Sequence, residues 1–144
     1  MCIRDRSLPT VEGAVNDILA QIVDFSVVFS MNGKDIDTHI VYDDDRVWSL
    51  ELSSGMERFI SSLAIRIGLM NVSNLPQGNF LAIDEGWGTM DSDNLNSVAQ
   101  LFQYLKSQFQ FTFVVSHIET MRDFVDTLLE IKKVDGSSSV RFSR

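Results

Sequence analysis

Two apolar stretches of the sequence each end in side chains suited to metal, acid–base or phosphate chemistry. Asp84 and Glu85 follow one stretch directly, and Ser116 and His117 follow the other. Carboxylates bind Mg²⁺ and act on an attacking water, and a histidine can contact a phosphate. If the two stretches are neighbouring parallel strands, these side chains meet at the edge where open α/β sheets bind ligands.

A serine beside a histidine also calls for a test of nucleophilic catalysis. Neighbours on an extended strand point to opposite faces, so Ser116 and His117 cannot readily share the hydrogen bond that a nucleophile and its base need. Phosphoryl transfer fits better, with Asp84 helping to hold Mg²⁺, Glu85 acting on a water and His117 contacting the terminal phosphate. The plain alternatives are a solvated acidic turn and a histidine with a satisfied hydrogen bond at a helix start.

Small residues form a second candidate site ahead of a helical pattern. Ser53, Ser54 and Gly55 let backbone amides approach a phosphate closely, and the dipole at a helix start favours negative charge. The alternative is an ordinary cap, in which either serine pairs with Glu57 in a capping box. Asp91 has a similar alternative as the cap of the helix that begins at the next residue.

The elements that must position these residues follow from hydrophobic periodicity, which alternates between helical and strand spacing. The predicted helices span Val11–Val23, the stripe Phe59–Ile67 and Leu95–Leu105, and the predicted strands are Phe25–Met31, Ile36–Tyr42, Arg46–Leu52, Asn79–Ile83, Phe111–Val115, Thr127–Val134 and Ser138–Phe142. The unit from Asn79 to Val115 reads strand, helix, strand, which predicts two parallel strands. The fold class is therefore α/β.

Composition limits the classes of protein and site. The chain has 144 residues, 44% of them hydrophobic, so one domain with a real core is expected. It has no apolar stretch of the roughly 18 residues that a membrane span needs, and no secretory signal at its start, so we expect a cytosolic protein. A single cysteine, Cys2, with His39 and His117 excludes a disulfide within the chain and a zinc-type cluster. Any metal must be bound by oxygen.

Four motifs in order resemble those of the ATP-binding-cassette ATPases. LSSGMER resembles the signature motif, FLAIDE the Walker B strand, GTMD the D-loop and VVSH the histidine switch. More closely, the span from about Leu8 to Phe142 resembles the C-terminal ATPase lobe of the SMC and SbcC class of DNA-repair and chromosome ATPases, including phage recombination subunits. Strand-rich sequence ahead of the signature favours this class over transporter ATPases.

The resemblance implies a role for each candidate residue. It places Ser53 and Gly55, with Ser54 between them, at the terminal phosphate of ATP held by the opposite subunit of a head-to-head homodimer. It further implies that Asp84 serves Mg²⁺, Glu85 the attacking water, Asp91 the dimer interface and His117 the terminal phosphate. The sequence departs from the family pattern at two positions, where Ser54 replaces a glycine and Met56 a glutamine or glutamate.

The phosphate-binding loop of such ATPases is missing from the sequence. The loop requires G-x-x-x-x-G-K-[ST], and the Gly-Lys pair at Gly33 lacks both the first glycine and the hydroxyl. The resembled class carries this loop on an N-terminal lobe, which a coiled coil separates from the C-terminal lobe. We therefore expect residues 1–7 to be a non-native or disordered start, and residues 8–144 to be the C-terminal half of the head, inactive without its N-terminal partner.

The resemblance also suggests a cellular role. Our first interpretation is an ATPase of DNA double-strand-break repair or recombination, with a metallophosphoesterase nuclease as a further partner. The alternatives are a chromosome-organising ATPase and a lobe that binds without hydrolysis. DNA is expected to bind the assembled complex, because four basic residues of the terminal hairpin cannot dominate a chain of net charge -8. They are Lys132, Lys133, Arg141 and Arg144.

Overall fold

The computed structural model describes residues 3–43, 46–74, 76–89 and 94–143 of the chain. Its elements in chain order are α1 (Ile3–Leu19), β1 (Phe25–Asn32), β2 (Asp35–Tyr42), β3 (Val47–Ser49), α2 (Gly55–Val72), β4 (Phe80–Asp84), α3 (Leu95–Gln108), β5 (Phe111–Val115), β6 (Leu128–Val134) and β7 (Ser137–Ser143). Short 3₁₀ segments occupy Leu50–Leu52 (η1), Trp87–Thr89 (η2) and Glu119–Phe124 (η4). The order confirms the predicted α/β class.

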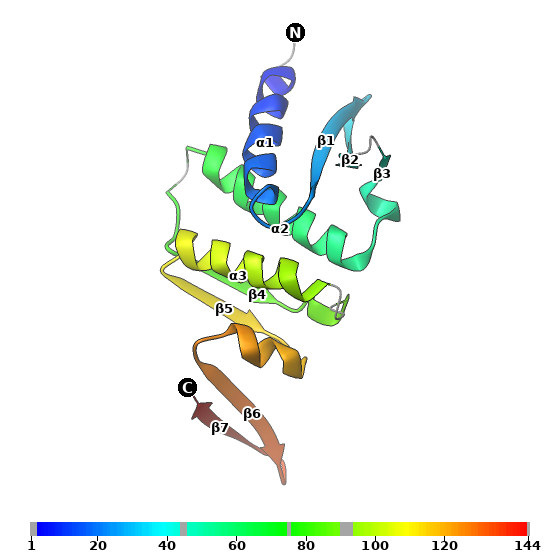
Figure 1. Ribbon diagram of the computed structural model, residues 1–144. Coiled ribbons are helices and arrows are strands. Elements are labelled where there is room, and N and C mark those ends of the chain that lie inside the picture. The colour runs from blue at the N-terminus through cyan, green and yellow to red at the C-terminus, as the bar shows by residue number, and fades with distance from the viewer. Residues whose placement is uncertain (1–2, 44–45, 75, 90–93, 144) are drawn as a thin grey trace.

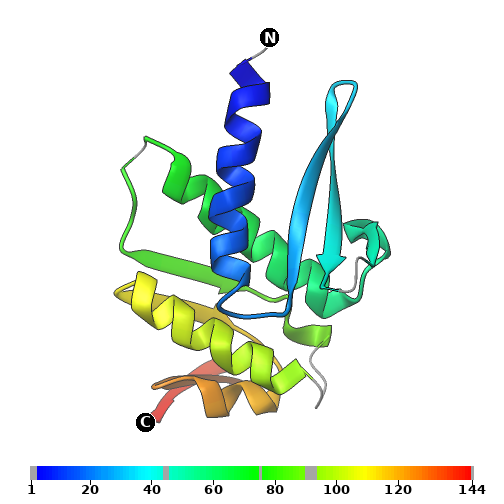
Figure 2. The same ribbon diagram turned by 45° about the horizontal axis from the view of Figure 1, so that its top comes forward.

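The first part of the chain is an antiparallel sheet, β1–β2–β3, with α1 beside it (Figures 1 and 2). Side chains of α1 bond the backbone of β1. The amide of Asn16 both donates to the carbonyl of Val27, at 2.9 Å, and accepts from its N–H, at 2.8 Å. A carboxylate oxygen of Glu12 accepts from the N–H of Phe29 at 2.7 Å. The helix thereby satisfies part of a strand edge that would otherwise be open.

Helix α2 is held by the apolar stripe that the sequence predicts. Ile60, Leu63, Ala64 and Ile67 are buried, whereas the polar residues between them lie on the outer face. The helix also approaches α1 closely at Gly68, where an added Cβ would lie 2.8 Å from a methyl carbon of Val15. Packing along its length therefore fixes the direction in which the start of α2 points.

The middle of the chain is a two-stranded parallel sheet with α3 against one face. Strands β4 and β5 pair in register from Phe80 opposite Phe111 to Asp84 opposite Val115. Helix α3 buries several apolar side chains in the core: Val98, Leu101, Phe102, Tyr104 and Leu105. The predicted strand–helix–strand unit with parallel strands is confirmed, and its two strand ends lie at the same edge.

Two apolar surfaces stay exposed in this part of the molecule. On the sheet side turned away from α3, Phe80, Phe111, Phe113 and Val115 form an apolar sheet face. On the terminal β6–β7 hairpin, the cross-strand pairs Leu129–Phe142 and Ile131–Val140 form an apolar hairpin face. Phe80 is 63% exposed and Phe142 is 74% exposed. Exposed apolar surface on this scale is typical of an interaction site.

Two predicted elements differ from those observed. Helix α1 begins at Ile3 and contains Pro9, whereas the sequence predicts a start at Val11, because a proline disfavours helix in the residue before it. The strand predicted to reach Leu52 stops at Ser49, whose hydroxyl accepts from the N–H of Glu51 and caps η1. Helix α1 crosses residue 7 without a break, and the domain boundary expected there stays a prediction.

Candidate active site

The first part of the candidate site is the carboxyl end of β4. Asp84 ends the strand and is exposed. Glu85 then turns sharply with a φ of 62°, in the left-handed region that residues other than glycine rarely adopt, and Gly86 follows with a φ of 102°. The N–H of Glu85 donates to the carbonyl of Val115 at 3.1 Å. The turn therefore holds Glu85 beside the end of β5.

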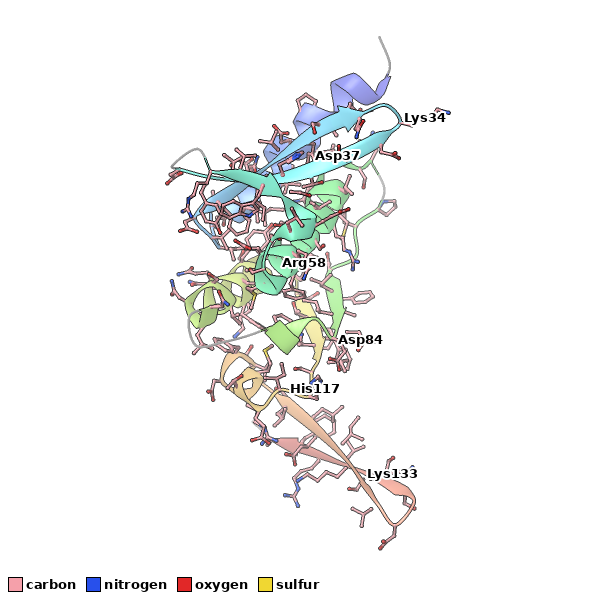
Figure 3. The ribbon with its side chains drawn as sticks, turned by 90° about the vertical axis from the view of Figure 1, so that its right-hand side faces the viewer. Lys34, Asp37, Arg58, Asp84, His117 and Lys133 are labelled. Carbon is pink, nitrogen blue, oxygen red and sulfur yellow. The ribbon has the colours of Figure 1, made fainter. Side chains whose placement is uncertain are left out.

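The histidine predicted at the neighbouring strand end meets this glutamate. The Nδ1 atom of His117 lies 3.1 Å from one carboxylate oxygen of Glu85 and 3.3 Å from the other. Both side chains are open to solvent, at 75% exposure for His117 and 53% for Glu85. Figure 3 shows Asp84 and His117 on the same side of the molecule. The predicted convergence of the two strand ends is thus confirmed.

Ser116 takes no part in this contact. Its hydroxyl accepts a hydrogen bond from the N–H of Ile118 at 3.1 Å, which turns it toward its own backbone. The observed partner of His117 is Glu85. The arrangement therefore agrees with the argument against a serine–histidine nucleophile.

The second part of the candidate site is the start of α2. Ser54 caps the helix, because its hydroxyl accepts from the N–H of Glu57 at 3.2 Å while the Glu57 carboxylate accepts from the N–H of Ser54 at 2.5 Å. The hydroxyl of Ser53 donates to the carbonyl of Leu50 at 2.7 Å, and Ser53 is only 9% exposed. The capping box expected as an alternative is present, and Ser54 is the serine that forms it. A cap does not exclude anion binding by the remaining amides.

Relatives of the chain are found among known proteins, although no family model matches it. It is 35% identical, over 92% of its length, to "Uncharacterized protein R555" of Acanthamoeba polyphaga mimivirus. It is 30% identical, over 83% of its length, to the C subunit of nuclease SbcCD of Staphylococcus aureus strain JH9. The chain spans 11% and 12% of the length of these two relatives.

The fold has a counterpart among solved structures. A structure from work on ATP-driven dimerization and DNA-stimulated activation of SMC ATPases matches 99% of this chain and 88% of its own, with a TM-score of 0.78 and 18% identity. The chain belongs to the SMC and SbcC class. It corresponds to the C-terminal lobe of the head in that class, with a parallel sheet, flanking helices and antiparallel hairpins.

In this SMC and SbcC lobe, a tyrosine that the sequence did not single out supports the helix start. The hydroxyl of Tyr42, at the end of β2, donates to the carboxylate of Glu57 at 2.5 Å. Burial opposes ionisation of Glu57, but hydrogen bonds from Tyr42 and Ser54 outweigh it and lower the pKa of Glu57. Burial and the bond to Glu57 raise the pKa of Tyr42. Tyr42 lies 15 residues before its partner, so no local motif could reveal the contact.

The metal and interface residues expected of this class are described in part. Asp91 lies outside the described residues. Among those that are described, no group of three or more His, Cys, Asp or Glu side chains could hold a metal ion by itself. The single carboxylate of Asp84 still fits Mg²⁺, which commonly takes one or two carboxylates and fills its other positions with water and phosphate oxygens.

The described helices also bear on the membrane. None of them is both long and apolar enough to cross a bilayer.

Proposed function

We propose that this lobe joins an N-terminal lobe carrying a phosphate-binding loop to form an ATPase head, and that ATP hydrolysis by the head drives DNA double-strand-break repair or recombination. The observation that carries the proposal is the 3.1 Å contact between Glu85 and His117 at the ends of two parallel strands. An acid and a histidine at this edge suit phosphoryl transfer. The relative named as a component of nuclease SbcCD supports the repair role and a nuclease partner.

Each residue at the strand ends has its own part in the proposed reaction. Asp84 helps to hold Mg²⁺, which supplies charge neutralisation at the phosphates when it is bound. Glu85 orients or deprotonates the attacking water. The Nδ1 atom of His117 faces Glu85, which leaves Nε2 to contact the terminal phosphate. Asp91 is proposed to lie at the interface of the dimer, beside the nucleotide.

The start of α2 is proposed to bind the terminal phosphate of ATP held by the opposite subunit of a head-to-head homodimer. Gly55 begins the helix, so amides of its first turn have no partner within the helix. The inward hydrogen bond of Ser53 favours a role in shaping the turn. We therefore assign the direct phosphate contact to Ser54 and Gly55, with Ser53 behind them.

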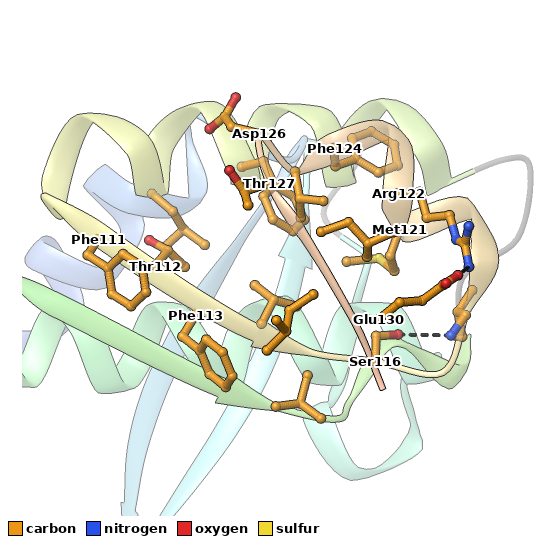
Figure 4. A pocket seen from close by; sticks show the side chains of 18 of the residues that line it. Phe111, Thr112, Phe113, Ser116, Met121, Arg122, Phe124, Asp126, Thr127 and Glu130 are labelled. Atoms are coloured by element: carbon orange, nitrogen blue, oxygen red, sulfur yellow. Dashed lines mark hydrogen bonds and ion pairs between the residues drawn. The ribbon is translucent and has the colours of Figure 1, made fainter. Parts of the chain in front are cut away.

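The missing lobe has a suitable docking place beside β5. A cleft of about 800 Å³ lies between β5 and the β6–β7 hairpin, and residues of both strands line it (Figure 4). Among the described residues, β5 pairs with β4 and β6 pairs with β7, so each strand keeps an edge toward other partners. The apolar sheet face adjoins this region. A lobe that adds backbone to these edges and covers the apolar surface would also shield the strand-end site from water.

DNA is proposed to bind the assembled complex more strongly than this lobe. The Glu130 carboxylate contacts Arg122 at 2.6 Å and Lys132 at 3.4 Å, so part of the positive charge near the hairpin is neutralised. Arg144 lies outside the described residues. Titration of duplex DNA at several salt concentrations should show weak binding by the isolated chain. Tight, salt-sensitive binding by that chain alone would contradict this expectation.

Hydrolysis by the joined lobes tests the proposed function. The chain is fused or co-expressed with the N-terminal lobe from the same source, and Glu85→Gln is compared with wild type. The amide keeps the size of the side chain but removes the base, so turnover should fall by roughly 100-fold or more while ATP still binds.

The Gln variant should also accumulate as an ATP-bound dimer. Glu119→Gln is the matched control, because Glu119 is an exposed acid of η4 outside the site. Normal turnover by Glu85→Gln would reduce Glu85 to a surface acid.

A further inference from the structure

The first turns of α2 touch the loop that carries Glu85. The ring of Phe59 lies directly over Gly86, where an added Cβ would come within 2.5 Å and 2.7 Å of two ring carbons. Such separations leave no room for a side chain, so close approach of the ring requires glycine at this position. The positive φ of Gly86 points to the same residue type.

The contact continues into a row of aromatic rings behind the strand ends. The Phe59 ring lies 4.7 Å from that of Trp87, which is fully buried. Trp87 stacks on Phe102 of α3 at 5.4 Å, and Phe102 stacks on Phe124 of η4 at 5.7 Å. The row therefore joins α2, the loop after β4 and the segment after His117 through rings that pack tightly and shift together.

Glu85 depends on its surroundings for its conformation. A residue other than glycine in the left-handed region persists where the surrounding structure over-determines it. Glu85 is held on one side by its N–H bond to Val115 and on the other by Gly86, fixed beneath Phe59. A change in the position of Phe59 thus acts on the backbone of Glu85 with only Gly86 between them.

We propose that Phe59 is a positioning residue that couples the helix start of α2 to the carboxylate of Glu85. The inference rests on the proposed function and extends it. A phosphate of the opposite subunit bound at the start of α2 would align Glu85 of this subunit's own site through Phe59 and Gly86. Each head would thereby sense that its partner holds nucleotide, and the coupling would act in both directions.

Kinetics of the joined-lobe protein test the coupling. Phe59→Leu keeps an apolar side chain but removes the ring from Gly86. Turnover should fall by roughly 10- to 100-fold because Glu85 is misplaced, whereas KM for ATP and ATP-dependent dimerisation should stay close to wild type.

Conservative and control variants complete this kinetic test. Phe59→Tyr retains the ring and should restore turnover. Phe29→Leu is the matched control, since Phe29 packs partly buried against the same core from β1. Unchanged turnover in Phe59→Leu, or an equal loss in Phe29→Leu, would overturn the inference. If Phe59→Leu does not fold, Phe59→Met takes its place, because it fills similar volume without a flat ring.

Amide hydrogen exchange of the 144-residue chain gives a readout that needs no hydrolysis. Phe59→Leu should speed exchange of the Glu85 amide, whose hydrogen bond to Val115 depends on the loop, and should shift the indole resonance of Trp87. Phe29→Leu should change neither. If the wild-type joined protein does not hydrolyse ATP, the proposed function fails, yet exchange still decides the coupling. Exchange and indole signals equal to wild type in Phe59→Leu would contradict it.

Discussion

The start of α2 and the ends of β4 and β5 are built in opposite ways. At the helix start, the Ser54 cap, the Glu57 carboxylate and the Tyr42 hydroxyl form a connected set of hydrogen bonds, partly buried and tied to β2. At the strand ends, Glu85 and His117 pair with each other and are more than half exposed. One region is finished within this lobe, and the other is open.

This difference indicates how the two regions depend on other parts of the head. A rigid, preformed set of amides binds an anion without reorganisation, so the start of α2 needs only a phosphate brought to it. Solvent at the strand ends weakens every charge interaction there, so these residues need a covering surface before they act. The exposed apolar sheet face lies on the side where such a cover would dock.

The largest expected effect breaks the finished region. Gly55→Arg places a bulky side chain where a phosphate would approach the first amides of α2, but it leaves the buried stripe of the helix intact. The variant should fold, and ATP-dependent dimer mass of the joined-lobe protein should be lost. Light scattering with and without ATP measures the dimer, and thermal unfolding checks the fold.

Ser62→Arg is the control for this variant, because it adds the same charge to the exposed face of the same helix. It should dimerise as wild type does. Mixing Gly55→Arg with a Glu85→Gln partner should show the defect at the opposite active site. If Gly55→Arg folds and dimerises normally with ATP, the start of α2 is a capped helix and nothing more.

A smaller effect sharpens the comparison at Tyr42. Tyr42→Phe removes the hydroxyl that bonds Glu57, which should cost about 1 kcal/mol of unfolding free energy at pH 7. The pKa of Glu57 is lowered in the folded chain, so its stabilising contribution is present above the ordinary value of 4.5 and is lost as pH falls below it. The gap between variant and wild type should therefore narrow in acid.

Chemical denaturation at about pH 7 and about pH 3.5, on either side of the ordinary glutamate pKa, measures both parts of this prediction. Tyr104→Phe serves as the comparison, since Tyr104 is a buried tyrosine of α3 away from the helix start. A gap for Tyr42→Phe that stays the same at both pH values would show that Glu57 does not depend on Tyr42.

The sequence sufficed for the parts of the site that local patterns encode. Alternation and apolar runs predicted β4 and β5 as parallel strands, and parallel strands bring Glu85 to His117 without further information. The small residues before the stripe of α2 predicted both a cap and an anion site, and the cap is present. These features depend on spacing within short segments, which periodicity reports directly.

The supporting contacts depend on tertiary packing and could not be predicted in this way. Tyr42 meets Glu57 from another element, and Phe59 meets Gly86 across 27 positions of the sequence. The glycine itself gave a weak signal, since a glycine after an acidic strand end is also common in ordinary turns. The early start of α1 was hidden by Pro9, whose effect on the preceding residue usually marks a boundary.

The ATPase rate of the 144-residue chain, alone and with increasing amounts of separately produced N-terminal lobe, tests the central claim most directly. The open strand ends should give no magnesium-dependent hydrolysis by themselves, because no residue set in this sequence wraps the phosphates. Activity should appear as the N-terminal lobe is added, saturate with complex formation and disappear in Glu85→Gln. Robust hydrolysis by the isolated chain that Glu85→Ala abolishes would contradict the account, since a contaminant would not respond to that substitution.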